Sequence, residues 1–443
     1  MRIQLSEHFS YGKLFRFSIP SIIMMVFTSI YGVVDGIFVS NFVGKQPFAA
    51  INLIMPILMI IGAFGFMMGA GGTAIVAKTL GEGDRDAANK YFSLIVYTTT
   101  AVGVAMAVCG FFLIRPLSSM LGAEGDLLEH CVVYGRIVIL AMPCFMVQNL
   151  FQSFFIAAEK PKLGLWVTVI AGVTNMLLDA LLVGIIPFGL EGAAIATSVS
   201  QLVGGIIPIF YFARKNDSLL RLTKTKLYSN VLLKSATNGS SEFMSNISMS
   251  IVTVAYNAQL MRFAGEDGVA AYGVIMYVGF IFAAIFIGYS IGTAPIIGFN
   301  YGANNQKELK SLLKKSAVIS FSSGAAMVIA SIFLARPLSS VFVGYDSALL
   351  EMTTKGLRIF LMSYFFSGFC IFTSSFFTAL NNGPISATIS FLRTLVYQLL
   401  GVIILPIFFE LDGIWFSMII AEVFALITTL IFLLINRKRY GYM

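Results

Sequence analysis

The chain has 443 residues, of which 58% are hydrophobic and 11% are charged, and its mean hydropathy is +0.88. This composition excludes a soluble globular domain of similar size and predicts an integral membrane protein. The formal net charge is +8. Most Lys and Arg lie outside the apolar stretches or near their ends, so we expect them to contact lipid headgroups rather than nucleic acid.

Apolar stretches of about 20 residues or more follow one another along the whole chain, and each can cross a hydrocarbon layer of about 30 Å as a helix. They lack the period-2 alternation of barrel strands, which are only about 9–11 residues long. The sequence therefore predicts an all-α integral membrane protein with twelve transmembrane helices. These run over 14–40, 47–77, 88–114, 126–157, 162–184, 191–213, 232–260, 269–297, 311–334, 350–380, 384–408 and 413–435.

The distribution of Lys and Arg indicates the orientation in the membrane. Counted at alternate helix ends, 21 lie on the side that holds both termini, 7 lie on the other side, and Arg393 is in mid-helix. Because cytoplasmic loops carry the excess of Lys and Arg, we expect both termini in the cytoplasm of a multi-pass inner-membrane protein. The polar residues 1–13 and the long first helix argue against a cleavable signal peptide.

The chain contains an internal repeat. Arg115-Pro-Leu-Ser-Ser119 recurs 221 residues later as Arg336-Pro-Leu-Ser-Ser340, and the same offset relates Gly81 to Gly302. Six helices return the chain to its starting side, so we expect two six-helix bundles related by a pseudo-two-fold axis along the membrane normal. The predicted parts are an N-terminal lobe (1–213), a cytoplasmic linker (214–231) and a C-terminal lobe (232–443). We expect the two lobes to rock against each other, so that access alternates between the two sides of the membrane.

Five polar residues of the first copy are candidates for a cation-coupling site. At about 1.5 Å per residue, all of them reach a similar depth in the outer half of the bilayer. Carboxylate, amide and hydroxyl oxygens suit a proton or a hard cation. The alternative is that the acids are protonated and only pack helices together. The candidates are Asp35, Tyr134, Asn175, Asp179 and Thr197, of which Asp35, Asn175, Asp179 and Thr197 could bind Na⁺.

The second copy offers a comparison. At the 221-residue offset Asp35 corresponds to Tyr256 and Thr197 to Met418. Asp179 corresponds to Leu400 or Gly401, depending on the register of the repeat. Acids needed only to hold a six-helix lobe together would be expected in both copies. The asymmetry favours a coupling site in the first lobe.

Three further ionisable residues lie within predicted helices. Glu242, about 15 Å deep, is a possible substrate contact or second titrating group, and the alternative is a carboxyl bonded to neighbouring serines. Arg393 and Glu422 lie near mid-depth and are expected to form an ion pair, with a structural role favoured over a functional one.

The sequence has none of the common motifs for nucleotide binding or catalysis, such as the P-loop, GxSxG or HExxH patterns. The two histidines and four cysteines have no metal-site or disulfide spacing. We therefore expect no enzyme and no cofactor, and transport driven by an ion gradient or by the substrate's own gradient. A membrane transferase would need polar catalytic clusters in the loops.

The chain resembles the multidrug and toxic compound extrusion (MATE) family, in particular its MepA-like and DinF-like branch. The resemblance spans the chain and rests on Pro20 and several short motifs. These are Asp35-Gly-Ile-Phe-Val39, Gly81-Glu-Gly-Asp84, the stretch from Asn175 to Asp179, Gly192-Ala-Ala-Ile-Ala-Thr197 and Gly298-Phe-Asn-Tyr-Gly-Ala303.

The resemblance implies proton- or sodium-driven antiport of organic cations or amphipathic drugs out of the cytoplasm, by a monomer in contact with membrane lipids. It also implies an N-lobe cation site at the five candidates named above. A second site, typical of NorM-like members, uses acids on helices 7 and 10. Glu242 matches the first of these acids, but helix 10 has only neutral residues such as Ser363, Tyr364 and Ser367.

The main alternative is a lipid-linked oligosaccharide flippase of the same exporter superfamily. A flippase should carry several basic residues in its central cleft to bind pyrophosphate. Apart from Arg393 the predicted helices contain almost no buried base, which favours a cationic or neutral substrate. The major facilitator family also has two six-helix halves, but residues 81–87 do not provide its loop signature.

Overall fold

The computed structural model describes residues 3–186 and 188–442, except for the side chains of residues 37, 40, 41 and 45, and these residues form helices and connecting segments without a strand. The helices are α1 (Tyr11–Phe42), α2 (Lys45–Gly81), α3 (Arg85–Met120), α4 (Gly125–Leu140), α5 (Met142–Ala157), α6 (Pro161–Asp179), α7 (Gly189–Ala213), α8 (Ser229–Gly302), α9 (Gln306–Val343), α10 (Ser347–Met362), α11 (Tyr364–Ala379), α12 (Gly383–Phe391) and α13 (Tyr397–Tyr440). Two π-helical segments, η1 (Ala180–Ile185) and η2 (Leu392–Val396), follow α6 and α12.

The helices account for twelve membrane crossings. Eight helices in the described ranges are long and apolar enough to cross, and α4 with α5 and α10 with α11 form two further bent pairs. Two of the eight are long enough to cross twice, because α8 has 74 residues and the run Gly383–Tyr440 has 58. Each contains one residue with positive φ, Gly265 at 62° and Glu410 at 48°. The all-α membrane fold expected from hydropathy is confirmed.

The backbone conformation repeats along the chain, as the amino-acid sequence does. Positive φ allows a sharp change of chain direction, which glycine adopts without strain. Three pairs of positive-φ residues are 221 positions apart, and a fourth pair is 222 apart. The pairs are Gly44 with Gly265, Gly83 with Asn304, Gly189 with Glu410, and Glu159 with Asn381. Helix ends and breaks therefore recur at the offset found from the sequence.

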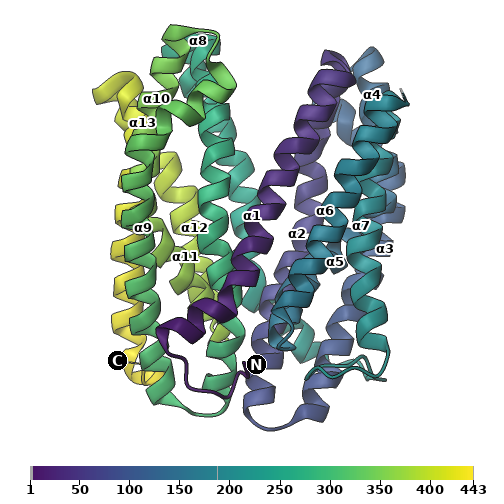
Figure 1. Ribbon diagram of the computed structural model, residues 1–443, viewed down its shortest axis with the longest axis vertical. Helices are drawn as coiled ribbons and strands as arrows, with labels where there is room; N and C mark the ends of the chain where they lie inside the picture. The colour runs from purple at the N-terminus through teal and green to yellow at the C-terminus, as the bar shows by residue number, and fades with distance from the viewer. Residues whose placement is uncertain (1–2, 187, 443) are drawn as a thin grey trace.

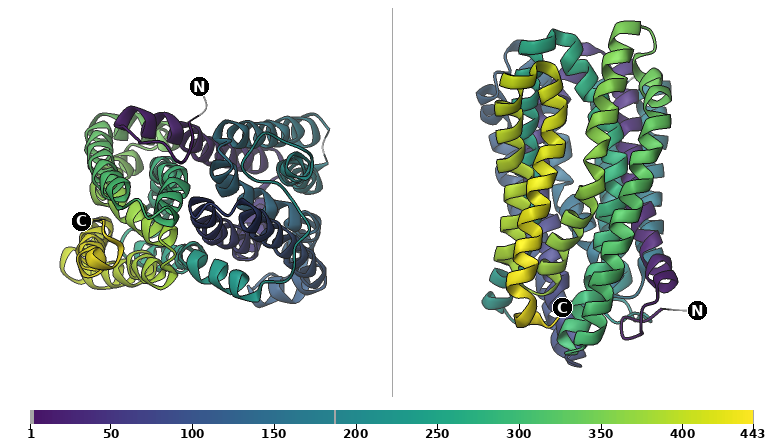
Figure 2. Two further views of the ribbon diagram at one scale, coloured as in Figure 1. Left: turned by 90° about the horizontal axis from the view of Figure 1, so that it is seen from below. Right: turned by 90° about the vertical axis from the view of Figure 1, so that its left-hand side faces the viewer.

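The helices form two groups, shown in Figure 1. We call 11–213, with α1 to α7, the N-lobe, and 229–440, with α8 to α13, the C-lobe. Both chain termini lie at one end of the molecule, here called the termini end, and the other is the far end. Figure 2 shows the two groups side by side from below and the helices running along the long axis. The lobes meet mainly where α1 and α2 pack on α8.

Glycines allow α2 and α8 to approach each other very closely. A Cβ atom on Gly71 would lie 1.9 Å from the Ser235 carbonyl oxygen, and one on Gly239 would lie 1.8 Å from the Met67 carbonyl oxygen. Neither position can accept a side chain unless the backbones move apart. This direct backbone contact holds the two lobes together in the half of the molecule nearer the termini.

A second glycine pair lies on the pseudo-two-fold axis. A Cβ on Gly81 would lie 2.0 Å from the carbonyl oxygen of Phe299, and one on Gly302 would lie 2.0 Å from that of Lys78. Gly81 and Gly302 are 221 positions apart, and so are Lys78 and Phe299. The two-fold operation therefore maps this contact onto itself. The axis inferred from the repeat therefore passes between the ends of α2 and α8.

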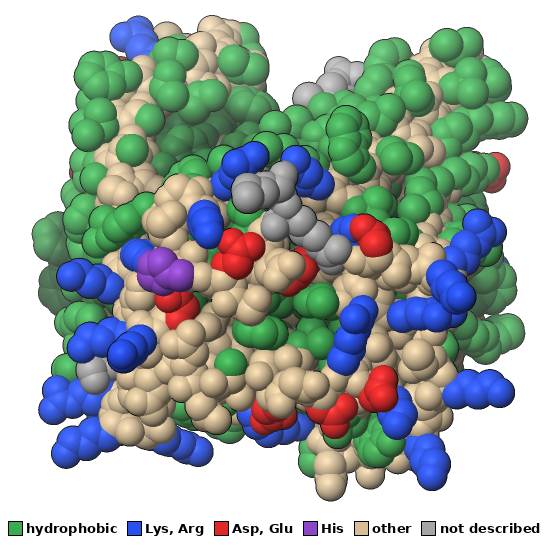
Figure 3. Space-filling view, turned by 60° about the horizontal axis from the view of Figure 1, so that its bottom comes forward, with side chains coloured by type: hydrophobic (Ala, Val, Ile, Leu, Met, Phe, Trp, Pro, Cys, Tyr) green, Lys and Arg blue, Asp and Glu red, His purple; other side chains and the backbone are tan. Residues whose placement is uncertain are grey.

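Charge is distributed unevenly over the surface. In Figure 3 the termini end carries most of the visible Lys, Arg, Asp and Glu, while apolar side chains cover the flanks. The same view shows a hollow between the lobes toward the far end. An apolar belt with a charged end is the surface expected of a protein that sits across a bilayer.

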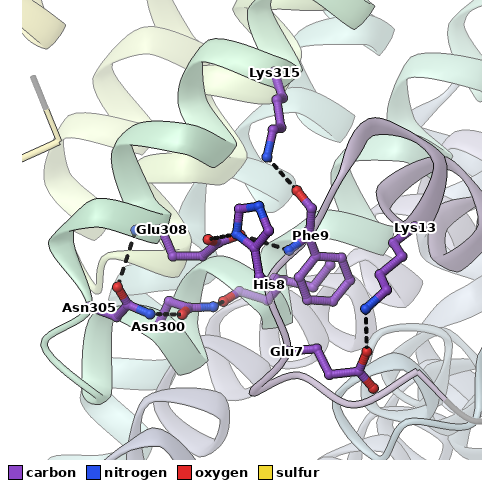
Figure 4. Close-up of polar contacts among 9 residues, drawn as sticks. Glu7, His8, Phe9, Lys13, Asn300, Asn305, Glu308 and Lys315 are labelled. Carbon is purple, nitrogen blue, oxygen red and sulfur yellow. Dashed lines mark hydrogen bonds and ion pairs between the residues drawn. The ribbon is translucent and has the colours of Figure 1, made fainter.

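The N-terminal arm, residues 4–10, contacts both lobes. The backbone N–H of Leu5 donates to Glu159 Oε1 of the N-lobe at 2.8 Å, and that of Phe9 donates to Glu308 Oε1 of the C-lobe at 3.0 Å. His8 Nδ1 lies 2.6 Å from the other oxygen of Glu308, and Lys315 Nζ donates to the Phe9 carbonyl (Figure 4). The arm thus bridges the lobes at the termini end.

The segment between the lobes follows α3. Arg85 Nη2 donates to the Ser218 carbonyl at 2.8 Å, and the Thr223 N–H donates to Ser93 Oγ at 2.8 Å. These contacts fix the connection along the N-lobe and leave α8 to begin at Ser229.

Candidate functional site

The five candidate residues of the N-lobe come from four helices. Asp35 lies on α1, Tyr134 on α4, Asn175 and Asp179 on α6, and Thr197 on α7. These helices contact one another, α1 with α6, α6 with α7, and α4 with α7. Asp35 and Asp179 lie within electrostatic range of each other and of Tyr134. The structure brings all five residues into one cluster, which we call the N-lobe cluster.

A glycine on α6 lets α1 approach the cluster. A Cβ on Gly172 would lie 2.5 Å from the Phe27 ring and 3.1 Å from the Tyr31 ring. Asn175 and Asp179 follow about one and two turns later on the same helix. Asp179 is the last residue of α6 before η1. A π-helical segment changes the direction of the following side chains and occurs often at functional sites.

Several oxygens of the N-lobe cluster are buried and lack a hydrogen-bond partner among the described residues. Tyr134, Asn175 and Asp179 are at most 2% exposed. Among the described residues the structure gives no hydrogen-bond partner to several buried side-chain oxygens of the cluster, and a buried polar group without a partner is costly. These oxygens are Asp35 Oδ1, Asn175 Oδ1, both carboxylate oxygens of Asp179, and Thr197 Oγ1. Oxygens without protein partners suit a bound cation or proton.

The matching position of the C-lobe is a satisfied packing contact. Tyr256, the counterpart of Asp35, is 1% exposed, and its hydroxyl lies 2.7 Å from Ser417 Oγ. Its ring stacks on Tyr272 with centroids 4.9 Å apart. The C-lobe therefore fills this place with a hydrogen-bonded aromatic pair, whereas the N-lobe holds two unsatisfied acids.

An elongated cavity lies mainly within the C-lobe. It has a volume of about 260 Å³, and its lining includes Glu242 of α8 and Arg393 of η2. The N-lobe adds Thr73 of α2 and Ser153 of α5, among other residues. We call it the C-lobe chamber. Tyr364, one of the neutral residues found where NorM-like members have their helix 10 acid, is part of its wall.

Arg393 and Glu422 form a bidentate ion pair beside the chamber. Arg393 Nε donates to both carboxylate oxygens at 2.9 and 3.0 Å, and Nη2 lies 2.9 Å from Oε1. The Glu422 side chain is fully buried and that of Arg393 is 15% exposed. Two parallel N–H···O bonds fix the orientation of both side chains.

Breaking this ion pair should destabilise the protein. In Glu422→Leu the guanidinium loses its carboxylate partner, and in Arg393→Met the carboxylate is left buried and uncompensated. We expect each single change to cost about 3–5 kcal/mol. The double change should cost less than either, which thermal unfolding in detergent would measure. A double variant as unstable as the sum of the two singles would contradict this expectation.

Sequence reasoning missed the chamber walls and found only the charged residues in them. The remaining lining is a mixture of apolar and hydroxyl side chains such as Met249, Tyr256, Phe280 and Ser390. Such residues also face lipid or neighbouring helices elsewhere in this chain, so no pattern distinguishes a wall position. The available signal was the pair of ionisable residues, Glu242 and Arg393, at mid-depth.

Comparisons with known proteins were made for both sequence and structure. The MatE family model matches the chain twice, over residues 20–181 and 243–404. The two matched stretches reproduce the internal repeat.

Among curated proteins, the chain is similar to a multidrug export protein MepA of Staphylococcus saprophyticus, at 23% identity over 96% of this chain and 93% of that protein. A protein of the same name from Staphylococcus haemolyticus is 24% identical over 93% of this chain and 90% of its own length.

Among solved structures, an outward-facing conformation of a multidrug resistance MATE family transporter superposes with a TM-score of 0.93 and 23% identity, over 99% of this chain and 98% of that one. A transporter of Pyrococcus furiosus, reported with a binding pocket of reversed polarity, gives a TM-score of 0.90 at 24% identity, over 99% and 97% of the two chains. These likenesses show that the fold is shared.

Proposed function

The chain belongs to the MatE family, and on that premise we propose that it is a cation-coupled antiporter rather than an enzyme. It would export organic cations or amphipathic compounds from the cytoplasm by alternating access, in exchange for H⁺ or Na⁺. The named similar proteins are multidrug exporters, which supports drug-like compounds as the substrate class.

The observation that carries the proposal is the set of unsatisfied oxygens in the N-lobe cluster. Two carboxylates close together in a low dielectric cannot both be ionised cheaply, so they bind a proton or a monovalent cation readily. Arrival of that cation changes the charge at the contact of α1 with α6. A ligand shifts a conformational equilibrium when it binds one state better than the other.

In this proposal the termini end faces the cytoplasm, as the excess of Lys and Arg there indicates. The N-lobe and the C-lobe rock about the close contact of α2 with α8, and the segment before α8 connects them. The described arrangement, with lobes joined at the termini end and a hollow toward the far end, then corresponds to a state open to the outside.

The ion pair argues against the flippase alternative. Binding pyrophosphate needs several uncompensated basic residues. The chamber wall contains one base, Arg393, and Glu422 already neutralises it. One paired base does not provide the several basic groups that a pyrophosphate needs.

Transport by purified protein in liposomes would test the function and identify the ion. Ethidium, a fluorescent organic cation, would be supplied outside vesicles with either an acidic lumen or a sodium-rich lumen at equal pH. We expect one of these gradients to drive ethidium uptake at least about tenfold above protein-free vesicles. Uptake that neither gradient stimulates would refute cation-coupled export.

A further inference from the structure

The C-lobe chamber has an unpaired acid in its wall. Among the described residues the Glu242 carboxylate has no hydrogen-bond partner: Ser240 Oγ donates to the Thr237 carbonyl, and Ser245 Oγ donates to that of Ser241. The neighbouring Asn246 bonds only the backbone carbonyl of Glu242. The serine-bonded alternative considered from the sequence is therefore absent. The carboxylate faces the chamber and can receive a cationic group.

Arg393 gives the same chamber a hydrogen-bond donor. Its Nε and Nη2 are directed at Glu422, whereas the described part of the chain provides no acceptor for Nη1. Arg393 lines the chamber, and the fully buried Glu422 does not. Glu422 therefore lies behind the guanidinium and orients it, and the positive end of the pair faces the cavity. Guanidinium N–H groups bind carboxylate and phosphate well.

The two groups lie at different depths. Gly383, at the start of α12, abuts Thr237 and Asn238 of α8, and both helices continue from there toward the far end. At about 1.5 Å per residue, Arg393 lies roughly 8 Å farther along the membrane normal than Glu242. A molecule that contacts both residues therefore has its two charged groups at different depths.

The apolar part of the chamber wall suits an aryl or alkyl body. It includes Met249, Val252, Met276, Phe280 and Phe360. Methionine side chains adapt to ligands of different shape, and a volume of about 260 Å³ is close to the lower range of small-molecule sites.

We propose that the C-lobe chamber binds elongated amphiphiles carrying a cationic group at one end and an anionic group at the other. The cationic group contacts Glu242 and the anionic group contacts Nη1 of Arg393. This assignment rests on the proposed export function and narrows its substrate class. A plain cation of the same size leaves the Arg393 donor without an anionic partner, and a site built to hydrogen-bond a group discriminates against analogues that lack it.

A matched pair of ligands tests the site without any change to the protein. The probes are 4-(4-aminobutyl)benzoic acid, which has an ammonium and a carboxylate at opposite ends, and its methyl ester, a cation of nearly the same shape. Calorimetric titration of the full chain in lipid nanodiscs should show the acid binding about tenfold more tightly than the ester. Equal affinities would overturn the proposal.

Variants assign the preference to the two residues. The double change Arg393→Gln with Glu422→Gln removes both charges and keeps two side chains that can hydrogen-bond to each other. It should abolish the preference for the acid over the ester, while the affinity for the ester stays the same. Glu242→Gln should weaken both probes about tenfold and keep their ratio. The control is the exposed pair Lys355 with Asp412, 2.7 Å apart, changed to Gln and Asn, which should leave the ratio unchanged. A preference that survives the Arg393 and Glu422 double change would also overturn the proposal.

The outcome separates this inference from the proposed function. Equal binding of acid and ester, together with gradient-driven ethidium transport, would reject the site and leave the exporter. A preference for the acid without any gradient-driven ethidium transport would support the site and reject the exporter.

Discussion

Gradient-driven efflux should fall by about 100-fold when Asp179 is replaced by Asn, and similarly for Asp35→Asn. Asn has almost the same shape as Asp but can neither take up a proton at physiological pH nor neutralise a bound cation. Both carboxyl groups contribute unsatisfied oxygens to the N-lobe cluster, so either change removes one of its two cation-binding carboxyl groups. The measurement is ethidium uptake into liposomes under the gradient that drives the unchanged protein.

The control for this prediction is Glu266→Gln, a carboxyl-to-amide change at an exposed position between the two crossings of α8. We expect it to transport at the original rate. The thermal midpoints of the two Asn variants should be equal to or above that of the original protein, because burying an amide costs less than burying a carboxylate. Full transport by both Asn variants would remove the N-lobe cluster from the mechanism.

The second large effect is expected at the contact between the lobes. Gly239→Ala places a Cβ atom 1.8 Å from the Met67 carbonyl oxygen, so α2 and α8 must move apart. Overpacking of this kind costs about 1–3 kcal/mol, which shifts a two-state equilibrium by roughly 5- to 150-fold. We expect the lobes to separate at the termini end and efflux to decrease by a similar factor.

The same helix offers a matched control. Gly273 also lies in α8, but a Cβ there would have nothing within 4 Å, and Gly273→Ala should transport normally. Spin labels on Lys90→Cys and Lys310→Cys, at exposed positions of the two lobes, in a background without native cysteines, would report the separation. An unchanged label distance in Gly239→Ala would contradict the idea that this contact closes the termini end.

The membrane crossings could be predicted because lipid imposes one requirement on every spanning helix, a long apolar stretch. The predicted stretch 47–77 lies within α2, Lys45–Gly81, and the other spans agree similarly well. Polar residues extend the helices beyond the hydrocarbon layer, where hydropathy gives no signal. The depth of Asp35 and Asp179 followed from the same rise per residue.

The sequence did not predict which way side chains face around each helix axis, or how the two lobes contact each other. Depth alone does not say which way a side chain faces, so the meeting of Tyr134 with Asp179 required the packing of α4, α6 and α7. The approach of Gly71 to Gly239 depends on how two lobes dock, which no local pattern encodes. The N-terminal arm was missed because polar residues before a first crossing usually carry no structural signal.

In the proposed mechanism the coupling carboxyl groups belong to the N-lobe cluster alone, and this limits how steeply substrate can be concentrated. Exchange of one proton for one monovalent organic cation moves no net charge, so the membrane voltage does no work and each pH unit sustains only a tenfold ratio, about 1.4 kcal/mol. Release of two protons by Asp35 and Asp179 in each cycle would move one net charge and add about 2.3 kcal/mol per 100 mV. Whether the steady-state ratio of substrate responds to voltage thus reports how many protons this single cluster carries.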